Sequence, residues 1–258
     1  MTTNGRSVPT VGVNTGAVML EVSRILMAPL VRAWAALAFE GKDSVPRPTD
    51  RPRSHAPGPD PDSVLVFGSG PASGWGVRTH DLAIPGSLAR ALAAHTGRGA
   101  DVDLNSNPLG RITDGFHDLV GIDLSGFDAV IVTLGVNDAV ELVSPKIWQF
   151  ELARILTHIS EHTPPHTRIY LLGIQPIRTI PVFDNRFFGT LADRHATALN
   201  KLTEARCAMM PRTTFVPLTG RPFIVAGRYR TSTDYHQWGE FLATEMAANL
   251  TATSLSRR

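Results

Sequence analysis

Cysteine, lysine and long uncharged apolar runs are scarce in this sequence. A single cysteine, Cys207, stands among 258 residues, so no disulfide framework can form within the chain. Cys207 is expected to be a small buried hydrophobic residue. Because nothing in this cysteine usage requires an oxidising compartment, we expect a cytoplasmic protein.

Positive charge is neither abundant nor clustered. The formal net charge is only +2, although the sequence pI is about 9.0, and lysine occurs only at positions 42, 146 and 201. No basic patch alternates with aromatic residues, so we expect no nucleic-acid partner. No group of His, Cys and Asp has the spacing of metal ligands, so neither a metal nor another cofactor is expected.

An apolar stretch at residues 17–40 is too interrupted to predict a membrane span. Glu21, Arg24 and Arg32 divide it, whereas a span needs about 18 uncharged apolar residues. Pro29 would kink a helix in this stretch. Two interpretations stay open: a helix packed on the domain, which we favour, and a helix that lies on a membrane surface.

After a segment rich in Pro, Asp and Arg (41–62), apolar runs and helical patterns alternate. Strands are predicted at 64–68, 101–105, 128–134, 168–173 and 214–217, and helices at 85–96, 145–162, 189–208 and 237–250. Such repeated units predict a parallel sheet with helices on both faces. We therefore expect an N-terminal tail, helix and Pro-rich linker (1–62), one α/β domain (63–250) and a C-terminal tail (251–258).

The first predicted strand runs directly into a glycine-rich loop, Gly68-Ser-Gly-Pro-Ala-Ser-Gly74. In open α/β sheets, chemistry is often placed at the carboxyl ends of the strands. One interpretation is a dinucleotide site, with Asp103 as a ribose partner. However, no helix begins directly after the loop, as a pyrophosphate site would need.

Two further predicted strands end in residues that could stabilise negative charge. Gly135-Val-Asn137-Asp138 follows a buried strand, where an Asn amide can point at a developing oxyanion. Gly110 follows the second strand and could present its backbone N–H to the same point. Each segment could instead be an ordinary turn.

A histidine near the start of the last predicted helix is a candidate general base. His236 follows Asp234 by two residues, and a carboxylate at this place could orient the imidazole. The chain has nine histidines, so a purely structural role is the alternative for this one.

In order and spacing, these signals resemble the SGNH hydrolases, also called GDSL esterases, over residues 63–250. Gly135-x-Asn137-Asp138 matches the third block of that family in full, and Gly110 matches the second. His236 matches the catalytic histidine, and Gly74 the end of the first block. The resemblance implies a three-layer α/β/α fold with about five parallel strands in the flavodoxin-like order 2-1-3-4-5. It also implies a serine esterase that needs no cofactor.

The chain departs from the family at the two residues that most define the chemistry. Against Gly-Asp-Ser-x-x-x-Gly, the family's aspartate falls on Ser69 and its nucleophilic serine falls on Gly70. The family's triad aspartate falls on Thr233, next to Asp234. Both residues are therefore displaced by one position.

Three hypotheses follow, and the retained oxyanion and base residues favour the first. It is an acyl-ester hydrolase or acyltransferase acting on a small acyl ester or an acylated carbohydrate. In its mechanism, the base takes the proton of the displaced serine, and the apolar loop 177–188 forms a wall for the acyl chain. The residues with assigned roles are Ser69 as nucleophile (Ser73 as a poorer candidate), His236 as base, Asp234 as its partner, Gly110 and Asn137 as oxyanion donors and Asp138 as support. The second is an inactive pseudo-esterase that binds an acylated or glycosylated ligand or a partner. The third is a dinucleotide-dependent enzyme.

Overall fold

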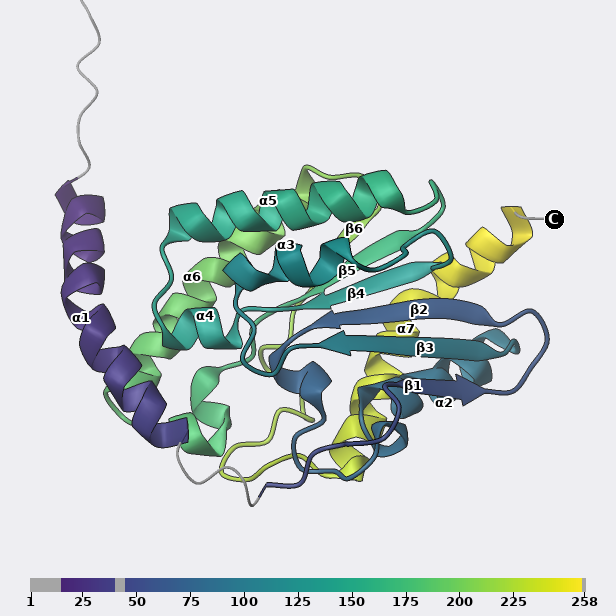
Figure 1. The fold of residues 1–258 in the computed structure, drawn as a ribbon, viewed down its shortest axis with the longest axis horizontal. Helices are drawn as coiled ribbons and strands as arrows, with labels where there is room; N and C mark the ends of the chain where they lie inside the picture. The colour runs from purple at the N-terminus through teal and green to yellow at the C-terminus, as the bar shows by residue number, and fades with distance from the viewer. Residues whose placement is uncertain (1–14, 40–44, 257–258) are drawn as a thin grey trace, which may run out of the picture.

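A six-stranded sheet forms the centre of the computed structural model, which describes residues 15–39 and 45–256 (Figure 1). The strand order is β1-β3-β2-β4-β5-β6, and the last five strands are parallel. These five strands have the predicted order, with β1 added at the edge. The strands are β1 (Arg53–Ala56), β2 (Asp62–Gly68), β3 (Ala100–Ser106), β4 (Ala129–Thr133), β5 (Arg168–Leu172) and β6 (Thr213–Val216).

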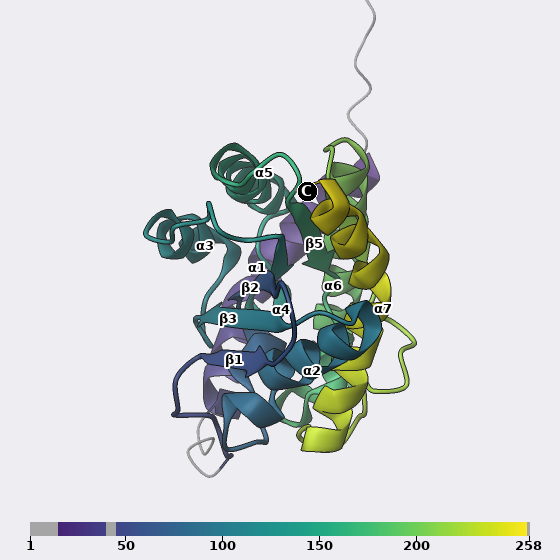
Figure 2. The ribbon, with the colours of Figure 1, turned by 90° about the vertical axis from the view of Figure 1, so that its right-hand side faces the viewer.

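Helices cover both faces of the sheet, so the predicted three-layer α/β/α architecture is confirmed. Figure 2 shows α3 and α5 on one side of the strands and α2 and α7 on the other. The helices of the domain are α2 (Ile84–Thr96), α3 (Ile112–Val120), α4 (Val136–Val140), α5 (Pro145–His162), α6 (Phe188–Ala208) and α7 (Ser232–Ser256). Because α7 continues to Ser256, most of the predicted C-terminal tail is helical; residues 257–258 lie outside the described part.

Alternate residues of each central strand enter two separate cores. In β4, Val130 and Val132 face the core shared with α3 to α6, whereas Ala129 and Ile131 face the core shared with α2 and α7. This follows from the two-residue period of a strand. Both faces are apolar, which explains why β2 and β4 read as continuous apolar runs in the sequence.

Part of the predicted Pro-rich linker forms a strand and packs on the domain in the structure. Within its described part, β1 pairs antiparallel with β3, and Arg53 forms ion pairs with Asp101 and Asp103 at 3.3 Å. Further upstream, the Pro46 carbonyl accepts a hydrogen bond of 2.9 Å from the Gly76 N–H. This part of the segment is therefore packed on the domain. Residues 40–44, and the tail before residue 15, lie outside the described residues.

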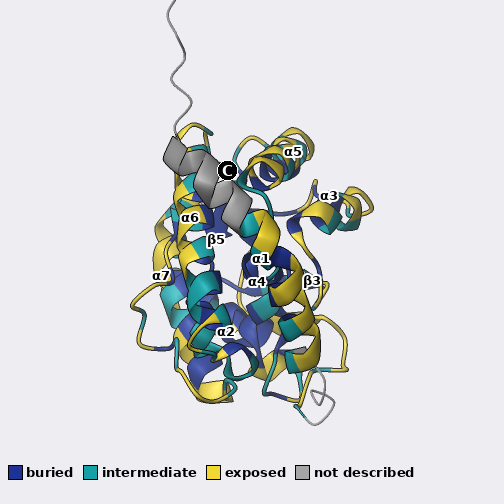
Figure 3. Ribbon diagram, turned by 90° about the vertical axis from the view of Figure 1, so that its left-hand side faces the viewer, coloured by how far each residue is buried: buried dark blue, intermediate teal, exposed yellow. Residues whose placement is uncertain are grey.

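The N-terminal helix α1 (Thr15–Phe39) packs on the domain through its second half, as favoured from the sequence. Val31 is fully buried, and the Trp34 ring stacks on Phe188, with 5.5 Å between centroids. Four large apolar side chains of α1 are exposed: Ile25, Leu26, Leu30 and Leu37. Figure 3 shows the molecule from the side on which α1 lies. Among the described helices, none has the length and apolarity to cross a membrane.

Candidate functional site

The loop after β2 is bent sharply, and its glycines make that bend possible. Gly68 has φ +135°, and a Cβ there would lie 2.0 Å from the Thr133 carbonyl oxygen. The Ser69 N–H donates a 2.6 Å hydrogen bond to the same carbonyl. Gly70 follows at φ +61°, in the left-handed region that glycine adopts without strain. The loop is therefore held against β4 through its backbone.

Ser69 and Gly70 face different surroundings. Ser69 is 1% exposed, and its buried Oγ has no hydrogen-bond partner among residues 15–39 and 45–256. Gly70 instead lines an open pocket of about 630 Å³ at the carboxyl ends of the strands. We call it the strand-end pocket; it is lined by Gly70, Pro71, Trp75, Pro108, Val136, Asn137, Gln175, Thr179, Ile180, Pro181, Val182, Phe183, Val225, Arg228, Tyr229 and Arg230.

The lining of the strand-end pocket is mostly apolar and includes the predicted wall. Ile180, Val182 and Phe183 come from the segment 177–188. None of the lining residues is a serine, cysteine, histidine, aspartate or glutamate. The charged groups of the wall are two arginines, Arg228 and Arg230. The pocket can therefore accommodate an apolar chain, but its walls contain neither the nucleophile nor the base of a serine hydrolase.

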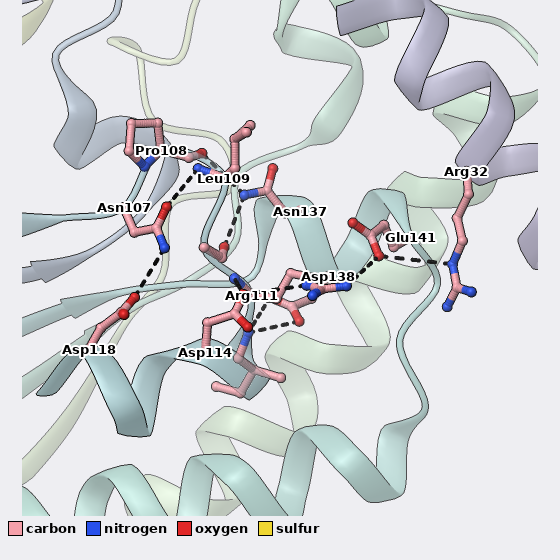
Figure 4. A network of polar contacts seen from close by, with 12 residues as sticks. Arg32, Asn107, Pro108, Leu109, Arg111, Asp114, Asp118, Asn137, Asp138 and Glu141 are labelled. Carbon is pink, nitrogen blue, oxygen red and sulfur yellow. Dashed lines mark hydrogen bonds and ion pairs between the residues drawn. The ribbon is translucent and has the colours of Figure 1, made fainter. Parts of the chain in front are cut away.

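The predicted oxyanion donors are used for contacts within the protein (Figure 4). Asn137 reaches the pocket, but its Nδ2 donates to the carbonyls of Pro108 at 3.2 Å and Gly110 at 3.0 Å. The Gly110 N–H donates to the Asn107 carbonyl at 2.9 Å, within a turn. In this arrangement the two groups join neighbouring loops, and Gly110 is not part of the pocket wall.

Asp138 lies beneath Asn137 and holds the start of α3. Its fully buried carboxylate accepts the Ile112 N–H at 3.0 and 3.1 Å, as drawn in Figure 4. Burial raises the pKa of Asp138 to about 7 from its ordinary value of 3.8, because the charged form loses its hydration. The contacts of Asp138 thus support the fold next to the pocket.

The predicted Asp234–His236 pair is not formed. Helix α7 begins at Ser232 rather than near residue 237, because Thr231 and Asp234 make a capping box. The Thr231 N–H donates to the Asp234 carboxylate at 2.7 Å, and the Asp234 N–H points back to the Thr231 hydroxyl at 3.5 Å. His236 consequently falls in the first turns of α7, where it is exposed and makes no hydrogen bond or ion pair to the described residues.

Arg228 is the partner of Asp234 in place of a histidine. Its two terminal nitrogens contact the two carboxylate oxygens at 2.6 and 2.9 Å. These hydrogen bonds lower the pKa of Asp234 to about 2 from 3.8. Asp234 is thus ionised at neutral pH and anchors the loop that carries Arg228.

A second cavity is lined by a serine, a histidine and an aspartate, the residue types of a serine hydrolase triad. Ser73, His80 and Asp50 all line it, between the segment 47–52 and the end of β3. The His80 Nδ1 lies 2.9 Å from an Asp50 carboxylate oxygen, but outside hydrogen-bond geometry. The buried Ser73 Oγ has no hydrogen-bond partner among the described residues. No hydrogen bond joins Ser73 to His80 in this structure.

The predicted ribose partner Asp103 lies on β3 in an ion pair with Arg53. The glycine loop leads into a 3₁₀ helix of four residues, Gly70–Ser73, and not into a long helix. Neither feature provides the helix N-terminus on which a pyrophosphate group binds.

The polar residues that line the pocket beside Asn137 lie outside the motifs of the sequence. Gln175 follows β5, and Arg228, Tyr229 and Arg230 lie in the loop before α7. No motif surrounds them. The one overlooked signal was Thr231-x-x-Asp234, which is typical of a helix start and predicts where this loop ends.

Comparisons with known proteins agree with this fold. The Lip_vut3 lipase from a goat rumen metagenome is 13% identical, with a TM-score of 0.57 over 73% of this chain and 99% of that one. A carbohydrate acetylesterase family member from Sinorhizobium meliloti is 17% identical, with a TM-score of 0.55 over 73% and 99%. An aryl esterase from M. smegmatis is 18% identical, with a TM-score of 0.53 over 72% and 99%.

Identity this low supports a shared fold and no more. No curated protein matches the chain. The model of the GDSL-like Lipase/Acylhydrolase family, however, matches residues 66–240, which is more than half of the sequence. The chain belongs to the GDSL-like lipase/acylhydrolase family.

Proposed function

We propose that this chain is a non-hydrolytic member of its family that binds an acyl ligand in the strand-end pocket. The observation that carries the proposal is Gly70. In the motif comparison, Gly70 falls where the family has its nucleophilic serine, and it lines the pocket without a side chain. No serine, histidine or carboxylate elsewhere in the lining replaces the missing groups.

The contacts of the displaced residues support the same conclusion. A nucleophile and its base act within about 2.6–3.2 Å of each other, in reach of the substrate. Ser69 is buried outside the pocket lining, and His236 is exposed on α7. The amide of Asn137 and the N–H of Gly110 already have acceptors. Among the described residues, the Ser69 hydroxyl therefore has no hydrogen bond to a base, and both predicted oxyanion donors are already used.

The pocket nevertheless has the composition of a ligand site. Such sites combine apolar walls with a few convergent polar groups. Here Val136, Ile180 and Val182 provide apolar surface, and Tyr229 and Arg230 provide polar groups. An acyl chain placed along the apolar wall would bring its polar end toward these polar groups.

The test measures binding and catalysis on the same protein. Decanoate and methyl decanoate are titrated while fluorescence is recorded, because Trp75 lines the pocket. We expect at least one ligand to bind saturably, with no hydrolysis of p-nitrophenyl esters and no labelling by a fluorophosphonate. Val182→Glu should abolish binding by placing a charge in the apolar wall. Val120→Glu, at a 52% exposed position on α3, is the matched control and should bind normally. If neither decanoate nor methyl decanoate binds, the proposal is refuted.

The residues that line the second cavity support one alternative function, ester hydrolysis at Ser73. Hydrolysis there would use Ser73 as nucleophile, His80 as base and Asp50 to orient the imidazole. In that reaction, His80 takes the Ser73 hydroxyl proton as Oγ bonds to the ester carbonyl carbon; the alcohol leaves with a proton, and water then releases the acid. Fluorophosphonate labelling that disappears in Ser73→Ala and persists in Ser69→Ala would establish this function and overturn the non-hydrolytic one.

A further inference from the structure

Arg230 lies in the wall of the strand-end pocket without an acidic partner. One terminal nitrogen donates to the side-chain oxygen of Gln175, which also lines the pocket. The Arg230 Nε is buried and has no hydrogen-bond partner in the described part of the chain. Its guanidinium carbon lies 5.2 Å from the centre of the Trp238 ring. Among the described residues, no carboxylate forms an ion pair with Arg230.

The neighbouring Arg228 is in a different electrostatic situation. The Asp234 carboxylate contacts both of its terminal nitrogens, so this pair adds no net charge to the pocket wall. Asp234 is further held by Thr231. The positive charge of Arg230 therefore remains uncompensated at the pocket. A partly buried cation that lacks an anionic partner is costly, and a bound anion would remove that cost.

We propose that the strand-end pocket binds an acyl chain in its carboxylate form, with Arg230 as the partner of the carboxylate. This inference rests on the proposed function and names its ligand class. A planar guanidinium can bind a carboxylate through two parallel hydrogen bonds. An ester carries no charge at the same place, so it gains much less from Arg230. The apolar wall of Ile180, Val182 and Phe183 takes the hydrocarbon part.

The experiment compares two ligands with the same acyl chain, one ending in a carboxylate and the other in the uncharged methyl ester. Decanoate and methyl decanoate are titrated into the full chain at pH 7.5, below the critical micelle concentration. We expect decanoate to bind roughly tenfold or more tightly, the usual size of a charge-assisted contact. Arg230→Gln should remove this preference. Arg230→Lys, which keeps the charge, should retain part of it. Arg194→Gln removes an exposed arginine of α6 and is the control for net charge.

The possible outcomes separate the inference from the proposed function. Equal affinity of the two ligands for the wild-type protein would overturn the role of Arg230 and leave acyl binding intact. A preference that persists in Arg230→Gln, with an unchanged thermal melting curve, would also overturn it. If neither ligand binds, the proposed function fails and the inference fails with it. The comparison of the two ligands on the wild-type protein tests the carboxylate preference even if Arg230→Gln does not fold.

Discussion

The two sides of the candidate site differ in what their residues are bonded to. On one side, Asn137 and Asp138 make four hydrogen bonds that join loops and hold the start of α3. On the other side, the buried Ser69 hydroxyl has no partner among the residues that the structure describes, and His236 is exposed to solvent. The residues that match the family pattern best thus have contacts that maintain the fold. Their presence identifies the fold family without implying catalysis.

The pKa values of the two carboxylates of the site, Asp138 and Asp234, are shifted in opposite directions. Asp138 is fully buried, and its pKa is raised to about 7. Asp234 is paired with Arg228, and its pKa is lowered to about 2. Protonation therefore affects the two sides in separate pH ranges, which allows each side to be examined alone.

The largest expected effect concerns Asp138. Between about pH 4 and pH 7, the unfolded chain loses the Asp138 proton while the folded chain keeps it. Stability contributed by this group is therefore fully present below pH 4 and is lost as the pH rises to 7. A shift of this size corresponds to roughly 4 kcal/mol. Urea unfolding of wild type and Asp138→Asn should give free energies that diverge across this range, and parallel curves would contradict the assignment. Asp234 acts only below pH 4, so it does not interfere.

Asn137→Ala should destabilise the protein by about 2 kcal/mol. The substitution leaves the Pro108 and Gly110 carbonyls without their donor, and unpaired buried polar groups cost about 1–3 kcal/mol. Denaturant midpoints measure the change. A variant as stable as wild type would mean that the Asn137 amide is available to a ligand, which would remove the contrast between the two sides.

Ser69→Ala should have a smaller effect of the opposite sign. The Ser69 Oγ is buried without a hydrogen bond, so its removal relieves an unpaired polar group. We expect the free energy of unfolding to rise by up to about 1 kcal/mol. A clear loss of stability in the same denaturant experiment would show that the hydroxyl has a partner in solution.

The smallest expected effect belongs to His236→Ala. The side chain is exposed and contacts no described polar group, so stability should change by less than about 0.5 kcal/mol. The dissociation constant of the acyl ligand should also be unchanged. Weakened ligand binding would place His236 near the ligand and remove the difference between the two sides of the site.

Long apolar runs made the parallel sheet predictable, whereas short or polar elements were missed. β1 has only four residues, and its Pro- and Arg-rich surroundings resemble a linker. The start of α7 depends on the pairing of Thr231 with Asp234, and Asp234 is the residue for which the family resemblance predicts a catalytic role. At the site, the sequence placed Gly70 and Asn137 near each other, and both line one pocket. The partners of Asn137 and Asp234 could not be predicted, because they are set by how distant loops pack.

The added edge strand has a consequence for how this chain can be shortened. Residues 53–56 occupy the open edge of β3, where unpaired N–H and C=O groups would otherwise be presented to other molecules. A fragment cut at residue 63, where the α/β domain was expected to begin, would expose that edge. Such a fragment would be prone to edge-to-edge self-association, so recombinant boundaries belong upstream of Arg53.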